Sequence, residues 1–317
     1  MKPDLFLADL ERKPEVLRAL ARRLRDEDPW AFLDGRPERV LLLGMGSSAY
    51  AGGVAAARLR ARGLTAVCEL ASSDLLPAWG DGTLVVAVSA TGGSRETLDA
   101  LARLSGGETV VALTNTDGSA VGSAAGHTVA MHAEPEDGGV ACRSFQHTLV
   151  QLLALERHLV GEPLAPLADD VDRAADASEH LLTTVDDWLP EVTDLLAGPD
   201  GTHLAAPARR FSSAQQGALM LREGPRRQAV GCEAGDWAHV DVYLTKNTDY
   251  RLLAFAGSAW DDGILEWTRP RGTTVVAVGG DFPDARATVR YPHDDVDDVR
   301  LLTETLVPEL VAARLWG

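Results

Sequence analysis

Short apolar, β-branched runs recur along the chain, and the stretches between them carry apolar residues at helical spacing. Ten such runs occur, at residues 39–44, 65–70, 83–89, 109–114, 127–132, 203–206, 228–231, 250–256, 273–279 and 287–291. Continuous apolar strands that alternate with helices indicate a parallel sheet covered on both faces. We therefore predict an α/β protein with two parallel-sheet α-β-α subdomains in tandem. The two halves share this pattern without obvious sequence identity.

The segments outside these strands set the expected domain boundaries. Residues 4–26 have the spacing of a docking helix, and helices are expected at 144–160 and at about 296–315. The acidic stretch between the halves is interpreted as a helical connector. The predicted division is an N-terminal docking helix at 1–30, a first domain at 31–162, the connector at 163–198 and a second domain at 199–317.

Composition narrows the class of partner. A net charge of −17 argues against nucleic acid, because phosphate backbones require clustered cations. The three cysteines are scattered, which suits a reduced compartment and suggests no disulfide framework or zinc cluster. The charged N-terminus does not look like a signal peptide, and no apolar run approaches the ~20 residues of a membrane span. We expect a cytoplasmic protein without a metal ion or other cofactor.

Small and hydroxyl-bearing residues follow two of the predicted strands. The turn after the first strand contains Gly46, Ser47 and Ser48, and the turn after the third contains Ser89, Thr91, Gly92 and Ser94. Ligands of open parallel sheets bind beyond the carboxyl ends of the strands, near helix N-termini. Glycine lets the backbone approach an anion, helical N–H groups point at it, and hydroxyls complete its shell. The two turns together predict a site for a phosphate monoester.

Other interpretations of these turns remain open. Either turn alone could be an ordinary connection with an N-cap serine. Neither is a P-loop, because no Gly-Lys-Ser/Thr sequence follows. The first turn lacks the third glycine of a dinucleotide fingerprint, but Glu69 lies about twenty residues on, so a nucleotide is not eliminated. The density of serines favours a terminal phosphate over a pyrophosphate.

The turns and several longer segments resemble the sugar isomerase (SIS) domain family, and more closely the isomerase half of the glucosamine-6-phosphate synthases. The family's Gly-x-Ser turn and Ser-x-Ser-Gly-x-Thr loop are similar to Gly46–Ser48 and Ser89–Ser94 here. The segments 136–148 and 214–241 and the leading helix are also similar, so the resemblance covers about residues 4–316. It implies SIS-type, flavodoxin-like subdomains, with no glutaminase domain expected in front.

The resemblance also implies roles for single residues. Glu223 stands at the position of the family's catalytic glutamate and His239 at that of its ring-opening histidine. Arg143 stands where a substrate-binding lysine is common. In this family the histidine commonly reaches the active site of a neighbouring subunit, so a homodimer is expected. Taken alone, Glu223 could instead be a solvated residue and His239 a structural one.

The sequence departs from the family pattern in three places. Ala90 and Gly93 replace the usual Gln and Glu of the second loop, which puts sugar-hydroxyl contacts there in doubt. No lysine lies beyond Lys246, so Schiff-base chemistry with a C-terminal lysine is not expected. The turn after the strand at 203–206 lacks glycine, so one phosphate site per chain is predicted.

The resemblance, together with the two serine-containing turns, therefore implies a phosphosugar isomerase-type enzyme. Its substrate would be a hexose phosphate or amino-sugar phosphate, and the reaction an aldose–ketose isomerisation or a related deglycation or deamination at C1 and C2. A carboxylate such as that of Glu223 can move the proton, and a histidine can open the ring near neutral pH. The alternative is a non-catalytic sugar-phosphate sensor, which needs the serines but no base.

Overall fold

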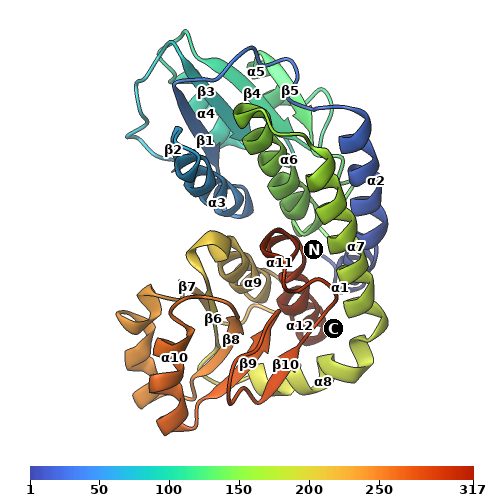
Figure 1. The fold of residues 1–317 in the computed structure, drawn as a ribbon, viewed down its shortest axis with the longest axis vertical. Helices are drawn as coiled ribbons and strands as arrows, with labels where there is room; N and C mark the ends of the chain where they lie inside the picture. Colours follow the sequence, from blue (N-terminus) through green and yellow to red (C-terminus); the bar gives the residue numbers. More distant parts are fainter. The chain divides into compact units, whose positions relative to one another are not determined.

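The computed structural model describes all residues from Met1 to Gly317, and the chain packs into two compact units (Figure 1). Residues 16–136 and 141–171 form the first, here the N-terminal sheet unit. Residues 1–15, 137–140 and 172–317 form the second, the C-terminal sheet unit. The first fifteen residues thus belong with the C-terminal half of the chain, which a linear division does not show.

The N-terminal sheet unit contains a five-stranded parallel sheet in the order β2-β1-β3-β4-β5. Its strands are β1 (Arg39–Gly44), β2 (Thr65–Leu70), β3 (Thr83–Val88), β4 (Thr109–Thr114) and β5 (His127–Ala130). Its own helices are α3 (Ser47–Ala61), α4 (Arg95–Ala102), α5 (Ala120–Ala124) and α6 (Arg143–Val160). Every residue of β3 is buried, as a strand covered on both faces requires.

The C-terminal sheet unit repeats this topology. Its sheet has the order β10-β9-β8-β6-β7, the same order as the first when its strands are numbered from β6. The strands are β6 (Thr202–Ala206), β7 (Ala229–Glu233), β8 (Arg251–Phe255), β9 (Thr274–Val278) and β10 (Ala287–Val289). The helices are α1 (Pro3–Glu11), α8 (Val185–Leu196), α9 (Phe211–Glu223), α10 (Asp261–Thr268), α11 (Asp297–Thr303) and α12 (Leu306–Trp316). Both sheets and the α/β class are therefore as predicted.

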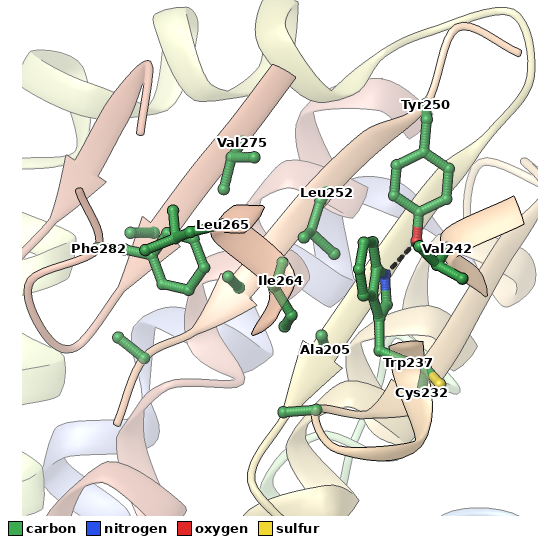
Figure 2. Close-up of a cluster of buried hydrophobic side chains, with 14 residues drawn as sticks. Ala205, Cys232, Trp237, Val242, Tyr250, Leu252, Ile264, Leu265, Val275 and Phe282 are labelled. Atoms are coloured by element: carbon green, nitrogen blue, oxygen red, sulfur yellow. Dashed lines mark hydrogen bonds between the residues drawn. The ribbon is translucent and has the colours of Figure 1, made fainter. Parts of the chain in front are cut away.

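One face of the C-terminal sheet is covered by a continuous apolar cluster. Trp237, Leu252, Val275 and Phe282 are among its members, and each is at most 4% exposed (Figure 2). Burying a large apolar side chain stabilises a fold by about 1.5–3 kcal/mol. This cluster fixes the connection after β7 against the sheet.

Two helices predicted as single elements are each broken in two. The segment 4–26 forms α1 and α2 (Lys13–Asp26), and the last segment forms α11 and α12. Pro14 and Pro308 each lie near the start of the second helix of their pair. Proline has no N–H to continue the preceding helix but is accepted in a first turn. The acidic connector is likewise two helices, α7 (Ala165–Thr183) and α8.

The N-terminal segment is held in the C-terminal sheet unit by buried contacts. The Phe6 and Trp316 rings lie 5.9 Å apart. The Lys13 ammonium is paired with the Glu309 carboxylate on α12, and both side chains are fully buried. Removing one partner of such a pair leaves an uncompensated buried charge. No helix in either unit combines the length and the apolar composition that crossing a bilayer requires.

Candidate phosphosugar site

Two loops leave neighbouring strands at the carboxyl edge of the N-terminal sheet. In the order β2-β1-β3-β4, the connection after β1 leads to one side of the sheet and the connection after β3 leads to the other. The point between β1 and β3 is therefore the switch point at which ligands bind in such sheets. Leu43 pairs in register with Ala87. Neighbouring strands are about 4.8 Å apart. The loops that begin at Gly44 and Ser89 therefore start side by side.

The first loop presents an uncapped helix N-terminus. Gly46 precedes α3 with a φ of 50°, a conformation that favours glycine, and no side chain caps the helix. Ser47 and Ser48 form its first turn, and their hydroxyls make no hydrogen bond within the protein. A helix N-terminus leaves several N–H groups without partners and favours negative charge. The Ser48 N–H donates to the Met45 carbonyl at 3.1 Å, so the anion site would be formed by the two free hydroxyls and the remaining amides of this first turn.

The second loop is held in one conformation by Gly92. Its φ is 63°, and a Cβ added there would lie 2.2 Å from the Ser119 Cβ, so no other residue fits. Ser89 is only 5% exposed, and its backbone N–H donates to the Leu113 carbonyl at 3.0 Å. Its hydroxyl makes no hydrogen bond within the protein. An unpartnered hydroxyl at a strand end is a group that a ligand can satisfy.

The remaining two hydroxyls of this loop are engaged. Ser94 caps α4: its Oγ accepts from the Thr97 backbone N–H at 3.2 Å and donates to Glu96 Oε2 at 3.1 Å. The Thr91 Oγ1 accepts from the Gly93 N–H at 3.4 Å. For Ser94 the ordinary N-cap interpretation is thus observed. Ligand contact from Ser94 or Thr91 would have to compete with these bonds.

Arg143 lies at the start of α6 and is fully buried. Its Nε donates to the Ala133 carbonyl at 3.0 Å, and its Nη2 donates to the Pro135 carbonyl. These bonds use the Nε and Nη2 groups of the guanidinium and fix its position. The structure supports a role of Arg143 in holding residues 133–135, whose carbonyls it bonds.

A carboxylate that the sequence analysis missed closes the N-terminus of α6. Glu136 Oε1 accepts from the backbone N–H groups of Cys142 at 2.7 Å, Arg143 at 2.6 Å and Ser144 at 3.1 Å. Glu136 lies six to eight residues before the amides that it accepts from, whereas the residues of a capping box are three apart, so a search for local capping patterns does not find it. The N-terminus of α6 is therefore already occupied, in contrast to that of α3.

Glu223 lies at the C-terminal end of α9 in the C-terminal sheet unit. Burial raises the pKa of its carboxyl from the ordinary value of 4.5, and the neighbouring Arg222 charge opposes this shift. A carboxylate with a raised pKa is a better proton acceptor, as a general base near neutral pH must be. The environment of Glu223 thus suits the role expected from the sequence.

His239 lies on the surface of the same unit, beyond the carboxyl end of β7. Glu223, in contrast, precedes the amino end of β7, since α9 runs back along the sheet before that strand begins. A strand of the length of β7 spans about 13 Å at ~3.3 Å per residue. Within one unit the two predicted catalytic residues therefore lie at opposite edges of the sheet.

The corresponding switch point of the C-terminal sheet is filled by the protein's own arginines. Arg210 is buried, and its Nη2 donates to the Ala256 carbonyl at 2.6 Å while its Nε donates to Glu304 at 3.1 Å. Arg209 donates to the Gly257 carbonyl at 2.8 Å. These arginines follow β6, which has the same place in its sheet as β1. The free serines Ser47 and Ser48 follow β1 in the first sheet.

The backbone amides of the loop after β8 are also already bonded, in this case to a carboxylate of the chain. Asp261 Oδ2 accepts from the backbone N–H groups of Gly257 at 2.7 Å and Ser258 at 3.1 Å. Burial raises the pKa of Asp261. Amides that could bind a phosphate already bind an anion of the chain. These contacts support the expectation of one phosphate site per chain.

Comparison with known families decides the class of the N-terminal sheet unit. The family model of the SIS domain matches residues 36–157, which include both serine loops and Arg143. Residues 36–157 belong to the SIS domain family. Glu223 and His239 lie outside the matched SIS domain.

Relatives that align with most of the chain are glutamine–fructose-6-phosphate aminotransferases. The glutamine–fructose-6-phosphate aminotransferases of Aeropyrum pernix and Pyrococcus horikoshii are 29% and 24% identical over 92% and 87% of this chain. The alignments cover 50% and 48% of those proteins. This chain thus spans about half the length of the curated relatives it matches.

Solved structures match the fold of both sheets. The C-terminal domain of glucosamine-fructose-6-phosphate aminotransferase from Francisella tularensis has a TM-score of 0.83, with 16% identity, over 99% of this chain and 96% of that one. Tagatose-6-phosphate ketose/aldose isomerase from Escherichia coli has a TM-score of 0.76, with 17% identity, over 98% and 91%. At these identities the likeness shows the fold alone, two five-stranded parallel sheets in tandem.

Proposed function

We propose that this protein binds a hexose phosphate or an amino-sugar phosphate and catalyses a reaction at its C1 and C2. The reaction is an aldose–ketose isomerisation or a related deglycation or deamination. The observation that carries the binding step is the set of three free hydroxyls, Ser47, Ser48 and Ser89, beside the uncapped α3. Proteins of similar sequence or fold are named for fructose 6-phosphate and tagatose 6-phosphate, which supports this substrate class.

Isomerisation requires one proton to move between adjacent carbons. Glu223 would remove the proton from C2 of the open aldose as the C2–H electrons form the C1–C2 double bond of an enediol and the carbonyl oxygen gains a proton. Return of a proton to C1 and loss of the O2 proton then give the ketose. His239 would act earlier, as the acid and base that opens the ring.

A homodimer is part of the proposal, because Glu223 and His239 lie at opposite edges of the C-terminal sheet. A histidine that acts with Glu223 in one site would then come from a second copy of the chain. The segment after His239 supports this, since Val240 is 53% exposed and Tyr243 is 62% exposed. Apolar side chains exposed together on a surface are typical of an interaction face.

A sugar-phosphate sensor is the second candidate. Ala90 and Gly93 offer no polar side chain toward sugar hydroxyls, although the loop that contains them retains Ser89. A sensor would bind phosphosugars with these loops and leave Glu223 without a chemical role. The two candidates differ in whether bound sugar exchanges hydrogen with solvent.

Hydrogen exchange in heavy water tests the proposal. The protein would be incubated with glucose 6-phosphate, fructose 6-phosphate, tagatose 6-phosphate and glucosamine 6-phosphate, and proton NMR would follow the C1 and C2 signals. We expect exchange with at least one of them and none with the unphosphorylated sugars. Binding of these phosphates without exchange would favour the sensor, and no binding would reject both candidates.

The raised pKa of Glu223 predicts the acid limb of the pH–rate profile. A base must be deprotonated, so kcat/KM should fall as pH decreases through the Glu223 pKa, which lies above the ordinary 4.5. Because the Arg222 charge lowers this pKa, Arg222→Gln should move the limb to higher pH. A limb that stays in place in this variant would argue against Glu223 as the base.

A further inference from the structure

His239 sits on a segment with little regular structure of its own. The segment Asp236–Lys246 consists of two 3-10 turns, η2 (Asp236–Ala238) and η3 (Asp241–Lys246), and His239 lies between them with its side chain exposed. The imidazole makes no hydrogen bond within the protein. Its position therefore depends on how the backbone on either side of it is anchored.

Two buried residues anchor the segment, one on each side of His239. Trp237 is fully buried, and Asp241 is 5% exposed. The Trp237 Nε1 donates to the Tyr250 hydroxyl at 2.8 Å, and that hydroxyl donates to Asp241 Oδ2 at 3.0 Å. Figure 2 shows the first of these bonds, between the indole and the phenol. One hydroxyl thus joins the two flanks of His239.

The chemistry of this bridge admits few substitutes. An indole N–H can only donate and a carboxylate can only accept, so the atom between them must do both. Burial, and secondarily the Asp241 carboxylate, raise the pKa of Tyr250, which keeps its hydroxyl protonated and able to donate. Phenylalanine would keep the ring and lose both hydrogen bonds.

The bridge is fixed to the sheet through Tyr250 and His203. Tyr250 immediately precedes β8, and its ring stacks on the His203 imidazole of β6 with centroids 4.1 Å apart. The His203 Nδ1 lies 3.3 Å from the same Asp241 oxygen. Two neighbouring strands therefore hold Asp241, and through Tyr250 they also hold Trp237.

We infer that Tyr250 is a positioning residue for His239: its hydroxyl clamps the two ends of the segment that presents the ring-opening imidazole. The inference rests on the proposed function for the role of His239, while the clamp itself is a property of the fold. A displacement of about 1 Å in a catalytic group can cost on the order of 100-fold in rate. Loss of the clamp should therefore slow ring opening and leave binding by the serine loops unchanged.

Tyr250→Phe tests the clamp, with Tyr291→Phe as the matched control. Tyr291 is a buried tyrosine of the same unit whose hydroxyl has no hydrogen-bond partner. Hydrogen exchange in heavy water would be measured with glucose 6-phosphate, which forms a ring, and with erythrose 4-phosphate, which cannot close one. In Tyr250→Phe we expect the rate for the ring-forming substrate to fall about 10- to 100-fold relative to the ring-free one. In Tyr291→Phe the ratio should not change.

A measurement without substrate keeps the clamp testable on its own. Amide hydrogen exchange of residues 236–246 should be faster in Tyr250→Phe than in Tyr291→Phe. If Tyr250→Phe does not fold, Asp241→Asn is the substitute, because its amide group replaces one acceptor oxygen and preserves the shape of the side chain. Amide exchange of residues 236–246 should then also be faster, by a smaller factor. Unchanged protection of this segment would overturn the clamp.

The two proposals fail in different ways. A wild-type protein that exchanges no sugar hydrogen would overturn the proposed function, whatever the amide exchange shows. An active wild type whose Tyr250→Phe variant keeps the control's ratio of ring-forming to ring-free rates would overturn the positioning role alone. Equal losses for both substrates would also overturn it, because they would indicate a general structural defect.

Discussion

Glu223→Gln should abolish hydrogen exchange between bound sugar phosphate and heavy water while leaving the sugar phosphate bound. Glutamine preserves the shape of the side chain and one hydrogen-bond acceptor, but it cannot take a proton from carbon. Loss of a general base typically lowers the reaction rate by about 100- to 10,000-fold. The measurement is proton NMR of the C1 and C2 positions, with affinity followed separately by calorimetry.

The stability of this variant distinguishes lost chemistry from lost structure. A carboxyl whose pKa is raised by burial stabilises the fold most when protonated, and that contribution is lost as pH rises through the raised pKa. At neutral pH the uncharged glutamine should therefore unfold at the same temperature as wild type or a higher one. Glu266→Gln, an exposed carboxyl on α10, is the control and should leave exchange intact. Full exchange in Glu223→Gln would remove Glu223 from the mechanism.

The Ser48→Ala, Ser89→Ala double variant should lose most of its affinity for phosphorylated ligands and keep its fold. Each hydroxyl makes no hydrogen bond within the protein, so its removal breaks nothing in the unliganded state. A hydrogen bond to a charged group contributes about 1.5–3 kcal/mol, and a factor of ten in affinity corresponds to about 1.4 kcal/mol. The double variant should bind at least about 100-fold more weakly in calorimetry.

The choice of serines matters for this experiment. Ser94 is a poor target, because its hydroxyl caps α4 and its removal should cost about 1 kcal/mol of stability regardless of ligand. Ser105 is a suitable control: it lies at the other edge of the sheet, and its exposed hydroxyl bonds only Glu108. Equal affinity in the double variant and in Ser105→Ala would refute the phosphate site at the switch point.

Local pattern was sufficient for the strands and for the loops that follow them. Buried parallel strands have continuous apolar runs, and clustered glycines and serines mark a turn whatever surrounds it. The helix breaks at Pro14 and Pro308 were also within reach of the sequence, since proline near the start of a helix is a local signal. They were missed because the apolar spacing continues across them.

The contacts that decide which polar groups are free could not be predicted. Arg143 is predicted as a substrate ligand from its position in the sequence, whereas the carbonyls that its side chain bonds depend on the path of residues 133–135. The partners of the Tyr250 hydroxyl come from positions 237 and 241, and its ring stacks on position 203, a set that no periodicity brings together. Side-chain hydrogen bonds between distant elements require the tertiary structure.

The buried pair between Lys13 and Glu309 constrains the order in which the protein can be completed on the ribosome. The two residues are 296 positions apart, so α2, which begins at Lys13, is synthesised long before α12, which contains Glu309. At about 5–20 residues per second, synthesis of the intervening chain takes roughly 15–60 s. Throughout that interval Phe6 has no Trp316 to pack against, and the Lys13 ammonium must stay in water. The N-terminal sheet unit, whose last residue is Val171, can form while the rest of the chain is being translated. The C-terminal sheet unit cannot bury Lys13 until α12 has left the ribosome.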